Sequence, residues 1–212
     1  ADGVEADFIS STISFDTNTR AEFLDIPIIN DSHVDSYGFY LAVCGYQPDW
    51  RGCVVYRSID EGLTWQQLHS IDRTQASAIG NALDVLAVYQ GSNTFDEISS
   101  VTVVLSDGEL EGVSETLALG GSNLALVGDE LIIFREAELI DEATYRLTGL
   151  LRGRFGTEHE MYSHASGDRF VLLNAAKTLR IDTPASDIGK VQLYKVVSFG
   201  LALEDAEVHA FM

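Results

Sequence analysis

The chain has 212 residues, and its 33 Asp and Glu against 13 Lys and Arg give a formal net charge of −20 at pH 7. Such a charge repels phosphate groups, which argues against nucleic acid or an anionic membrane surface as a partner. No apolar run is long enough to cross a bilayer, so we expect no membrane-spanning segment.

Short runs of alternating apolar and polar residues, with 18 Gly and only 3 Pro, predict an all-β protein. We expect a β-sandwich or barrel-like sheets built from hairpins and meanders, with one short helix. Residues 1–24 are expected to be an N-terminal strand and linker from an upstream domain. Residues 25–112 and 113–212 are expected to form two β-rich lobes. The chain starts at Ala1 and carries no terminal signal, so we expect a portion of a longer polypeptide.

The N-terminal part begins with an expected strand at Asp7–Phe15. Pro27 then confines the next apolar stretch to a sheet edge or an extended connector. Three strand patterns follow between residues 37 and 70 and predict a meander. Cys44 and Cys53 flank the first turn of this meander. A disulfide between them and a pair of buried thiols stay open as alternatives.

The second turn of the meander carries the pattern S-x-D-x-G-x-T-W at Ser58–Trp65, known as an Asp-box. Asp60 is suited to accept bonds from loop amides, Gly62 to take a positive φ and Trp65 to pack beneath the turn. Asp-boxes recur in sialidase-type propellers, but this chain has one copy and no repeated blade. We therefore interpret it as a structural hairpin.

Strands are next expected at Ala82–Tyr89 and Ile98–Leu105. A serine cap followed by good helix formers predicts the short helix at Ser114–Leu119. Gly128 and Asp129 then form a two-residue hairpin signal between apolar runs.

The run Leu150–Glu158 (LLRGRFGTE) stands out because basic residues are few in this chain. One interpretation is that Arg152 and Arg154 bind carboxylates of a neighbouring subunit or a receptor glycan. The other is that Arg152 pairs with an internal acid such as Glu136 or Glu138 and fixes a structural corner. In the second, favoured interpretation the glycines of the run serve backbone geometry, namely Gly149, Gly153 and Gly156.

The same run carries a resemblance to a known family. The segment Tyr145–Glu158 (YRLTGLLRGRFGTE), His164 and Gly167–Leu173 (GDRFVLL) occur here in the order found in that family. They resemble the C-terminal region of the tail hub or tail-tip protein of gene transfer agents and related siphophages. Further matching pieces upstream of the run are Asp25–Pro27, Tyr40–Val43, Val54–Ser58 and Gly128–Ile132. Phe155 departs from the pattern, where a basic residue is expected.

The resemblance implies a structural component of a phage-like tail tip or baseplate hub, located in the virion. Its partners would be other tail-tip proteins in a homo-oligomeric ring or cap, and a glycan or receptor on the host surface. In that family a glycoside-hydrolase-like TIM barrel precedes the β-rich end. No catalytic carboxylate of such a barrel transfers to a residue of this chain.

The residues themselves favour no enzyme, metal or cofactor. No nucleophile elbow and no cysteine–histidine signature occurs, and the spacing of His159 and His164 fits no zinc or EF-hand pattern. Aromatic residues on turns suggest a different class, a carbohydrate-binding β-sandwich module or a remnant glycosidase lobe. The candidate contacts for a glycan or partner are Tyr46, Trp50, Arg51 and Tyr162, and Trp50 is the preferred glycan contact.

Overall fold

The structure, a computed structural model, describes residues 19–91 and 93–212, so the strand expected at Asp7–Phe15 lies outside the described residues. The strands are β1 Thr19–Leu24, β2 Gly38–Gly45, β3 Gly52–Ser58, β4 Gln66–Asp72, β5 Ile79–Ala82, β6 Val101–Asp107, β7 Leu124–Val127, β8 Glu130–Asp141, β9 Thr144–Leu151, β10 Arg169–Leu172, β11 Leu179–Asp182, β12 Gln192–Ser198 and β13 Val208–Phe211. The helices are α1 Glu115–Leu119 and the 3-10 turns η1 Asp31–His33, η2 Arg73–Gln75, η3 Arg154–Gly156, η4 Glu158–Tyr162, η5 Ala185–Asp187 and η6 Leu203–Asp205. The predicted all-β class is confirmed.

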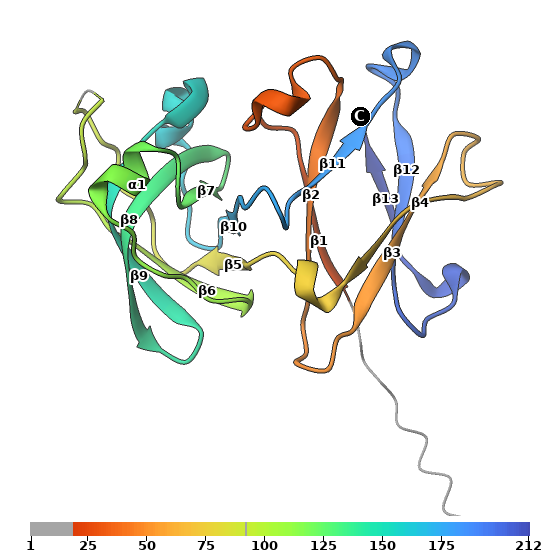
Figure 1. Cartoon of the computed structure of the whole chain (residues 1–212), viewed down its shortest axis with the longest axis horizontal. Coiled ribbons are helices and arrows are strands. Elements are labelled where there is room, and N and C mark those ends of the chain that lie inside the picture. Colours follow the sequence, from red (N-terminus) through yellow and green to blue (C-terminus); the bar gives the residue numbers. More distant parts are fainter. Residues whose placement is uncertain (1–18, 92) are drawn as a thin grey trace, which may run out of the picture.

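Six strands close into an antiparallel barrel in the order β10-β5-β6-β9-β8-β7 (Figure 1). Successive side chains of a strand face opposite sides, so every second residue points into the barrel. The inward side chains form one apolar cluster with members from all six strands, among them Val103, Ile132, Phe134, Leu147 and Phe170. Closure pairs the strands on both sides and leaves the barrel without a free edge.

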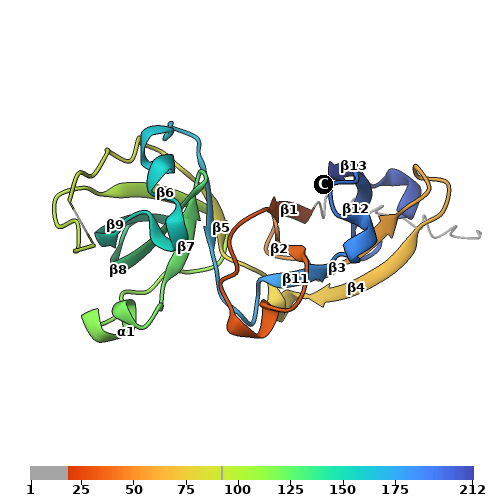
Figure 2. The ribbon, with the colours of Figure 1, turned by 90° about the horizontal axis from the view of Figure 1, so that it is seen from above.

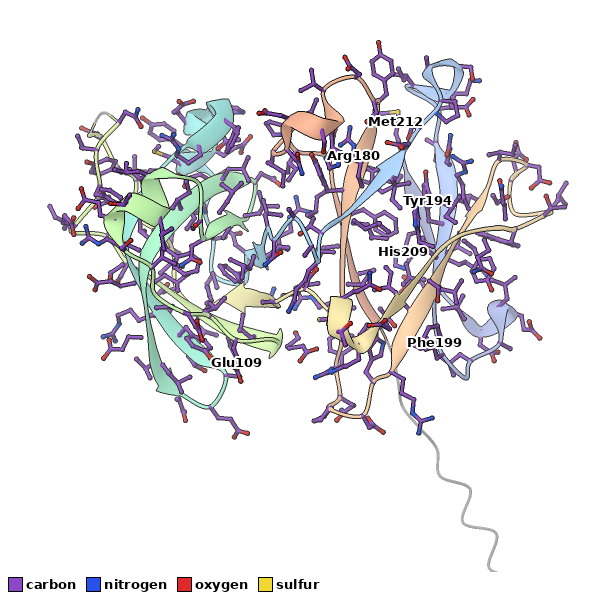
Figure 3. All side chains as sticks on the ribbon, in the orientation of Figure 1. Glu109, Arg180, Tyr194, Phe199, His209 and Met212 are labelled. Atoms are coloured by element: carbon purple, nitrogen blue, oxygen red, sulfur yellow. The ribbon has the colours of Figure 1, made fainter. Side chains whose placement is uncertain are left out.

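The other strands form two antiparallel sheets, β1-β2-β11 and β13-β12-β3-β4, which face each other as a sandwich. Aromatic rings fill the space between them. The ring centroid of Phe39 lies 4.5 Å from that of Phe211 and 5.3 Å from that of Tyr194. Figure 3 labels Tyr194 and His209 within this sandwich lobe and Glu109 in the barrel lobe.

The two lobes share part of their cores. Leu126, Leu131 and Val171 belong to barrel strands, yet they pack in the same buried cluster as Leu41 and Val43 of the sandwich. Their neighbours along β7, β8 and β10 point the other way, into the barrel. The period of two along these strands therefore serves both the barrel interior and the contact between lobes.

The chain enters the sandwich, passes through the barrel between β5 and β10 and returns to the sandwich (Figures 1 and 2). The expected division at residue 112 does not follow these lobes, because β5 and β6 precede it while the other four barrel strands follow it. Likewise, the end of the expected linker 1–24 is β1, which pairs with β2 along its whole length.

Several local elements match their prediction. The α1 helix has Ser114 as its N-cap, with the side chain accepting a bond from Leu117 N, and the β7–β8 hairpin turns at Gly128 and Asp129. The strand expected at Ala82–Tyr89 is wrong. The strand β5 instead ends at Ala82 because the chain leaves the barrel there, and Leu83 and Val85 are exposed.

Among the described residues, no helix has the length and apolar character needed to cross a membrane.

Candidate functional site

Three segments of the barrel lobe meet at one corner: the β7–β8 turn, the end of β9 and the loop before β10. Gly128 and Gly153 have φ angles of 60° and 56°, a left-handed conformation that glycine adopts readily. These turns bring Glu130, Arg152 and His164 together although they are distant in sequence. We call the cluster of Asp96, Glu130, Arg152, His164 and Asp168 the arginine corner.

The arginine corner is centred on a bidentate ion pair between Arg152 and Glu130. Arg152 Nε and Nη2 donate to Glu130 Oε1 and Oε2 at 2.9 and 2.8 Å. The Arg152 side chain is 1% exposed and that of Glu130 is 0% exposed. Gly153 N donates to Glu130 Oε1 at 2.6 Å. The planar guanidinium fork matches the carboxylate, which favours arginine over lysine here.

The third nitrogen of Arg152 ties the corner to the loop between β5 and β6. Nη1 donates to the carbonyl oxygen of Ala87 at 2.8 Å and lies 3.5 Å from Asp96 Oδ2. Asp96 Oδ1 also accepts bonds from the amides of Ile98 and Ser99. One guanidinium therefore joins a hairpin, the end of β9 and a long loop.

His164 connects the ion pair to the start of β10. Its Nε2 lies 2.7 Å from Glu130 Oε2, and its Nδ1 lies 3.0 Å from Asp168 Oδ2. Burial lowers the pKa of His164, but hydrogen bonds to Glu130 and Asp168 outweigh burial, so this pKa lies above its usual value. A protonated imidazole, with both nitrogens as donors, satisfies the two carboxylates.

The charge on Glu130 is stabilised by the same contacts. Burial raises the pKa of Glu130, whereas bonds from His164, Arg152 and the Gly153 amide lower it more, so this pKa lies below its usual range. The charged groups of the corner are thus committed to internal partners. This arrangement holds in place the segments that carry these residues.

The favoured sequence interpretation, in which Arg152 pairs with an internal acid, agrees with this geometry, but the acids named for it were wrong. The partner is Glu130, not Glu136 or Glu138, because the side chain of Arg152 points toward the β7–β8 turn. Glu136 instead lies near Arg135, and Glu138 near Arg146.

Sequence reasoning also gave no role to four members of the corner, namely Asp96, Glu130, His164 and Asp168. They are separated from Arg152 by between 12 and 56 positions in the printed sequence, and no spacing rule joins them. The ordered motifs that contain Glu130, His164 and Asp168 were the one available signal.

The segment that builds this corner also has a counterpart among known families. Residues 77–171 match the family model described as Rcc01698-like, C-terminal. This family is typical of proteins from gene transfer agents and phage-like particles. The match spans the barrel from β5 almost to the end of β10 and includes all five residues of the arginine corner. No curated protein matches the chain in sequence.

The second arginine of the matched run lies at the surface of the corner. Arg154 Nη1 donates to Asn93 Oδ1, and the neighbouring Phe155 is 51% exposed with a φ of 56°. Thr157, closing the same turn, accepts a bond from Leu131 N at 2.9 Å and is buried. Gly156 has a φ of 88°, with open space where a Cβ would stand.

The Asp-box lies in the sandwich, outside the matched segment, as the turn between β3 and β4. Asp60 accepts bonds from the Thr64 amide at 2.9 Å and from the Thr64 hydroxyl at 2.6 Å, and Ser58 Oγ donates to it at 2.7 Å. These bonds lower the pKa of Asp60 to about 2. Gly62 has a φ of 91°, and Lys195 Nζ lies 5.2 Å from the centre of the Trp65 ring. The turn is built as the structural hairpin that the sequence predicts.

The two cysteines are free and buried. Cys44 lies on β2 opposite Arg20, whereas Cys53 lies on β3 between Ile71 and Ser198. Burial raises the pKa of each thiol to about 12. Of the two alternatives that the sequence leaves open, the structure therefore has the pair of buried thiols.

The aromatic candidates for glycan contact divide into buried and exposed residues. Trp50 is 1% exposed and its Nε1 donates to Thr19 Oγ1, so the preference for Trp50 as a glycan contact was wrong. Its ring packs against Gly45 instead of solvent. Tyr46 and Tyr162 are 52% and 74% exposed, and Arg51 is also exposed.

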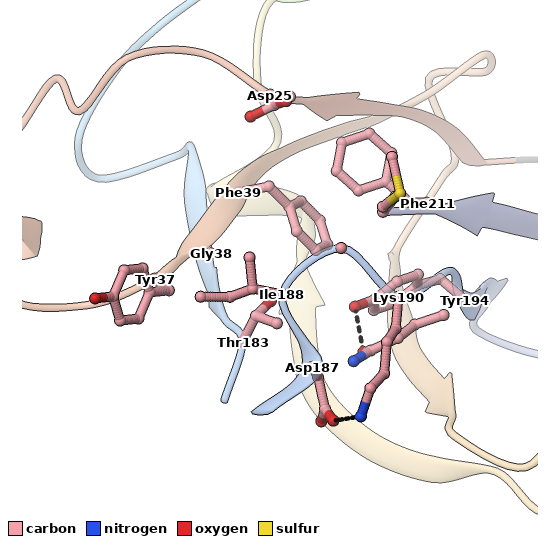
Figure 4. A pocket seen from close by; sticks show the side chains of 13 residues that line it. Asp25, Tyr37, Gly38, Phe39, Thr183, Asp187, Ile188, Lys190, Tyr194 and Phe211 are labelled. Atoms are coloured by element: carbon pink, nitrogen blue, oxygen red, sulfur yellow. Dashed lines mark hydrogen bonds and ion pairs between the residues drawn. The ribbon is translucent and has the colours of Figure 1, made fainter. Parts of the chain in front are cut away.

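A cavity of about 330 Å³ opens at the end of the sandwich, where β2 starts and β13 ends (Figure 4). Phe39 and Tyr194 lie at its base, and Tyr194 donates a bond to Gln192 at 2.9 Å. Lys190 and Asp187 form an ion pair of 3.2 Å on its rim. We call this the sandwich-end cavity. Its lining is mainly apolar and suits an aromatic or aliphatic group.

No group of three or more His, Cys, Asp or Glu side chains within residues 19–91 and 93–212 is arranged to hold a metal ion.

Proposed function

We propose that the chain is a structural component of a phage-like tail tip, where it contributes to tail assembly and to contact with the host surface. The observation that carries this proposal is the arginine corner. Three sequence motifs that identify the resemblance to tail-hub proteins, one each around Glu130, Arg152 and His164, supply its interlocked charges. They do so inside the segment that matches the Rcc01698-like family model.

The form of the corner supports a mechanical role. A buried ion pair whose donors and acceptors all have partners fixes the relative position of the segments that carry it. Moving one member would leave another charge unpaired. A particle component must keep its shape while its neighbours assemble around it. We propose no enzymatic activity for this segment, and we expect the purified chain alone to release no sugar from cell-wall or surface glycans.

In this role the chain is part of the virion and contacts other tail-tip proteins in a ring or cap. The net charge of −20 bears on those contacts, because identical acidic surfaces repel one another. Copies of the chain would therefore be held together through neighbouring proteins with basic surfaces or through apolar contacts. Exposed apolar residues of the barrel lobe are available for this, including Leu117, Leu119 and Ile98.

The composition of purified particles tests this proposal. Particles are separated from free protein on a density gradient, and the chain is quantified by mass spectrometry against the major tail-tube protein. We expect the chain in the particle fraction at a small number of copies per particle. Its absence from that fraction, with the chain recovered only as free protein, would contradict a tail role.

A carbohydrate-binding module that acts apart from any particle is the second candidate. The exposed Tyr46 favours it. A free module would sediment as a monomer in cell extracts and would bind glycans there. The same gradient separates this candidate from the first.

A further inference from the structure

A second and larger cavity, of about 700 Å³, is lined by residues of both lobes. Its walls come from β1, the turn after β2, barrel strands β5 and β6, and the segment from β12 to β13. We call it the inter-lobe cavity. Its volume falls within the range of about 300–1,000 Å³ that small-molecule sites occupy. Its lining is mainly polar, in contrast to the sandwich-end cavity.

Arg20 organises the polar wall of the inter-lobe cavity. Its Nε and Nη2 donate to Glu22 Oε1 at 3.1 and 2.9 Å. Nη1 donates to Asn81 Oδ1 at 2.8 Å and to Ser106 Oγ at 3.0 Å, and Nη2 also donates to Gly80 O at 3.1 Å. A guanidinium has five N–H groups, so Arg20 is fully used by these five bonds. It holds groups of the sandwich and of the barrel in one fixed arrangement.

The groups that Arg20 fixes retain hydrogen-bonding capacity for a ligand. Ser106 accepts from Arg20 through its oxygen, so its own hydroxyl proton is not used in that bond. Both bonds to Glu22 end on Oε1, which leaves Oε2 as an acceptor not used by Arg20. The carboxylates of Asp205 and Glu207 line the same cavity. A donor and several acceptors, placed in advance, suit a ligand rich in hydroxyl groups.

An aromatic side chain also lines the inter-lobe cavity. Tyr46 lines it from the turn after β2 and is 52% exposed. The C–H face of a sugar ring is apolar, whereas its edge carries hydroxyls, so a sugar is satisfied by an aromatic ring beside polar groups. Among the exposed tyrosines named as glycan candidates, Tyr46 lines this cavity and Tyr162 does not.

The carboxylates that line the inter-lobe cavity determine which sugars it would favour by charge. Glu22, Asp205 and Glu207 place three carboxylates in a chain of net charge −20, and the positive charge of Arg20 is engaged by Glu22. An acidic sugar would meet repulsion that a neutral sugar does not, and an amino sugar would gain attraction.

From this arrangement we propose that the inter-lobe cavity binds a neutral or amino-sugar glycan, with Tyr46 against the ring face and Ser106 donating to a ring hydroxyl. This inference rests on the proposed function for its setting, since it assigns the host-surface contact to one cavity. Arg20 is a positioning residue, because its five N–H groups already donate to Glu22 and to groups of β5 and β6.

Binding is tested with the purified 212-residue chain on an array of neutral, amino-sugar and acidic oligosaccharides, followed by calorimetry with the strongest ligand. We expect neutral or amino-sugar ligands to bind and acidic ones to fail. Tyr46→Ala should weaken binding about tenfold or more, and Ser106→Ala about fivefold. Tyr162→Ala and Tyr37→Ala remove exposed tyrosines outside this cavity and should leave affinity unchanged.

Each contrary result overturns the inference. These results are a chain that binds no glycan, a preference for acidic sugars, or a loss of affinity in Tyr37→Ala or Tyr162→Ala but not in Tyr46→Ala. The proposed function fails separately, in the particle gradient. If the chain is found in particles but binds no glycan, the proposed tail role is supported and the proposed glycan site is contradicted. If the chain binds glycans but is absent from particles, the proposed glycan site is supported and the proposed tail role is contradicted.

Discussion

Among single residues, Arg152 is expected to contribute strongly to stability. Its removal leaves Glu130 buried without its main partner, and breaking a buried ion pair in this way costs about 3–5 kcal/mol. We predict that Arg152→Ala lowers the free energy of unfolding by about this amount in urea titrations. Arg146→Ala is the matched control, because Arg146 is half exposed and lies 3.7 Å from Glu138. It should change stability by less than about 0.5 kcal/mol. Equal effects of the two variants would refute the role given to Arg152.

His164 gives the corner a dependence on pH. Hydrogen bonds to Glu130 and Asp168 raise its pKa in the folded state above the usual value of 6.5. Its stabilising contribution is therefore complete below that value and is lost as the pH rises through the folded-state pKa. We predict that the stability difference between the natural chain and His164→Asn is largest near pH 6 and shrinks as the pH rises through the folded-state pKa of His164. Urea unfolding at several pH values measures it, and a difference that grows with pH would contradict the assignment.

The cysteines offer a direct check on the sandwich core. Because burial raises the pKa of Cys44 and Cys53 to about 12, little thiolate exists near neutral pH. We predict no alkylation of the folded chain at about pH 8, and alkylation of both thiols after denaturation without a reducing agent. Mass spectrometry counts the labels. If neither thiol reacts in the denatured chain, a disulfide joins them.

At the scale of elements, the turn after β9 depends on two glycines in different ways. A Cβ at Gly153 would lie 2.7 Å from Glu158 Cγ and 2.8 Å from its Cα, whereas a Cβ at Gly156 meets nothing within 4 Å. Both positions have a positive φ. Gly156→Ala should thus cost about 1 kcal/mol through backbone strain alone. Gly153→Ala adds a clash and should cost at least about 1 kcal/mol more. Thermal unfolding of both variants compares them, and a larger loss in Gly156→Ala would contradict this geometry.

Elements with strong local chemistry were predictable from the sequence, and those that depend on distant pairing were not. The Ser114 cap and the Gly128–Asp129 turn depend on residues that are neighbours in the sequence. Their residue types therefore predict them. The strand expected at Ala82–Tyr89 has a suitable apolar pattern, but the barrel uses only its first residue. The four-residue strands β11 and β13 were not predicted, because they form by pairing with the distant or longer strands β2 and β12.

The candidate sites also divide into local and long-range arrangements. The Asp-box is local, so the sequence predicted that Asp60 accepts bonds from loop amides, although it did not single out Thr64 as the donor. The arginine corner combines residues from four separate segments, and the sequence indicated an internal partner for Arg152 without identifying Glu130. Whether an aromatic residue on a turn is buried or exposed depends on packing across the sandwich. For this reason Trp50 was misjudged.

At the scale of the whole molecule, the barrel is inserted into the sandwich and the two lobes share core residues. The chain leaves the sandwich after η2 and returns at β11, so both connections between lobes are close to the shared cluster. Arg20 adds a polar link from β1 to β5 and β6. The shared core and the bonds of Arg20 hold the two lobes together, as the proposed role in a particle would require.

The proposed place of the chain at a tail tip can be tested by labelled electron microscopy. Particles carrying an epitope-tagged copy of the chain are purified, incubated with gold-conjugated antibody and imaged in negative stain. We expect gold at the end of the tail that is distal to the head, with unlabelled particles from an untagged strain as the control. Gold on heads or along the tail tube, or no gold on particles that contain a full tail, would contradict it.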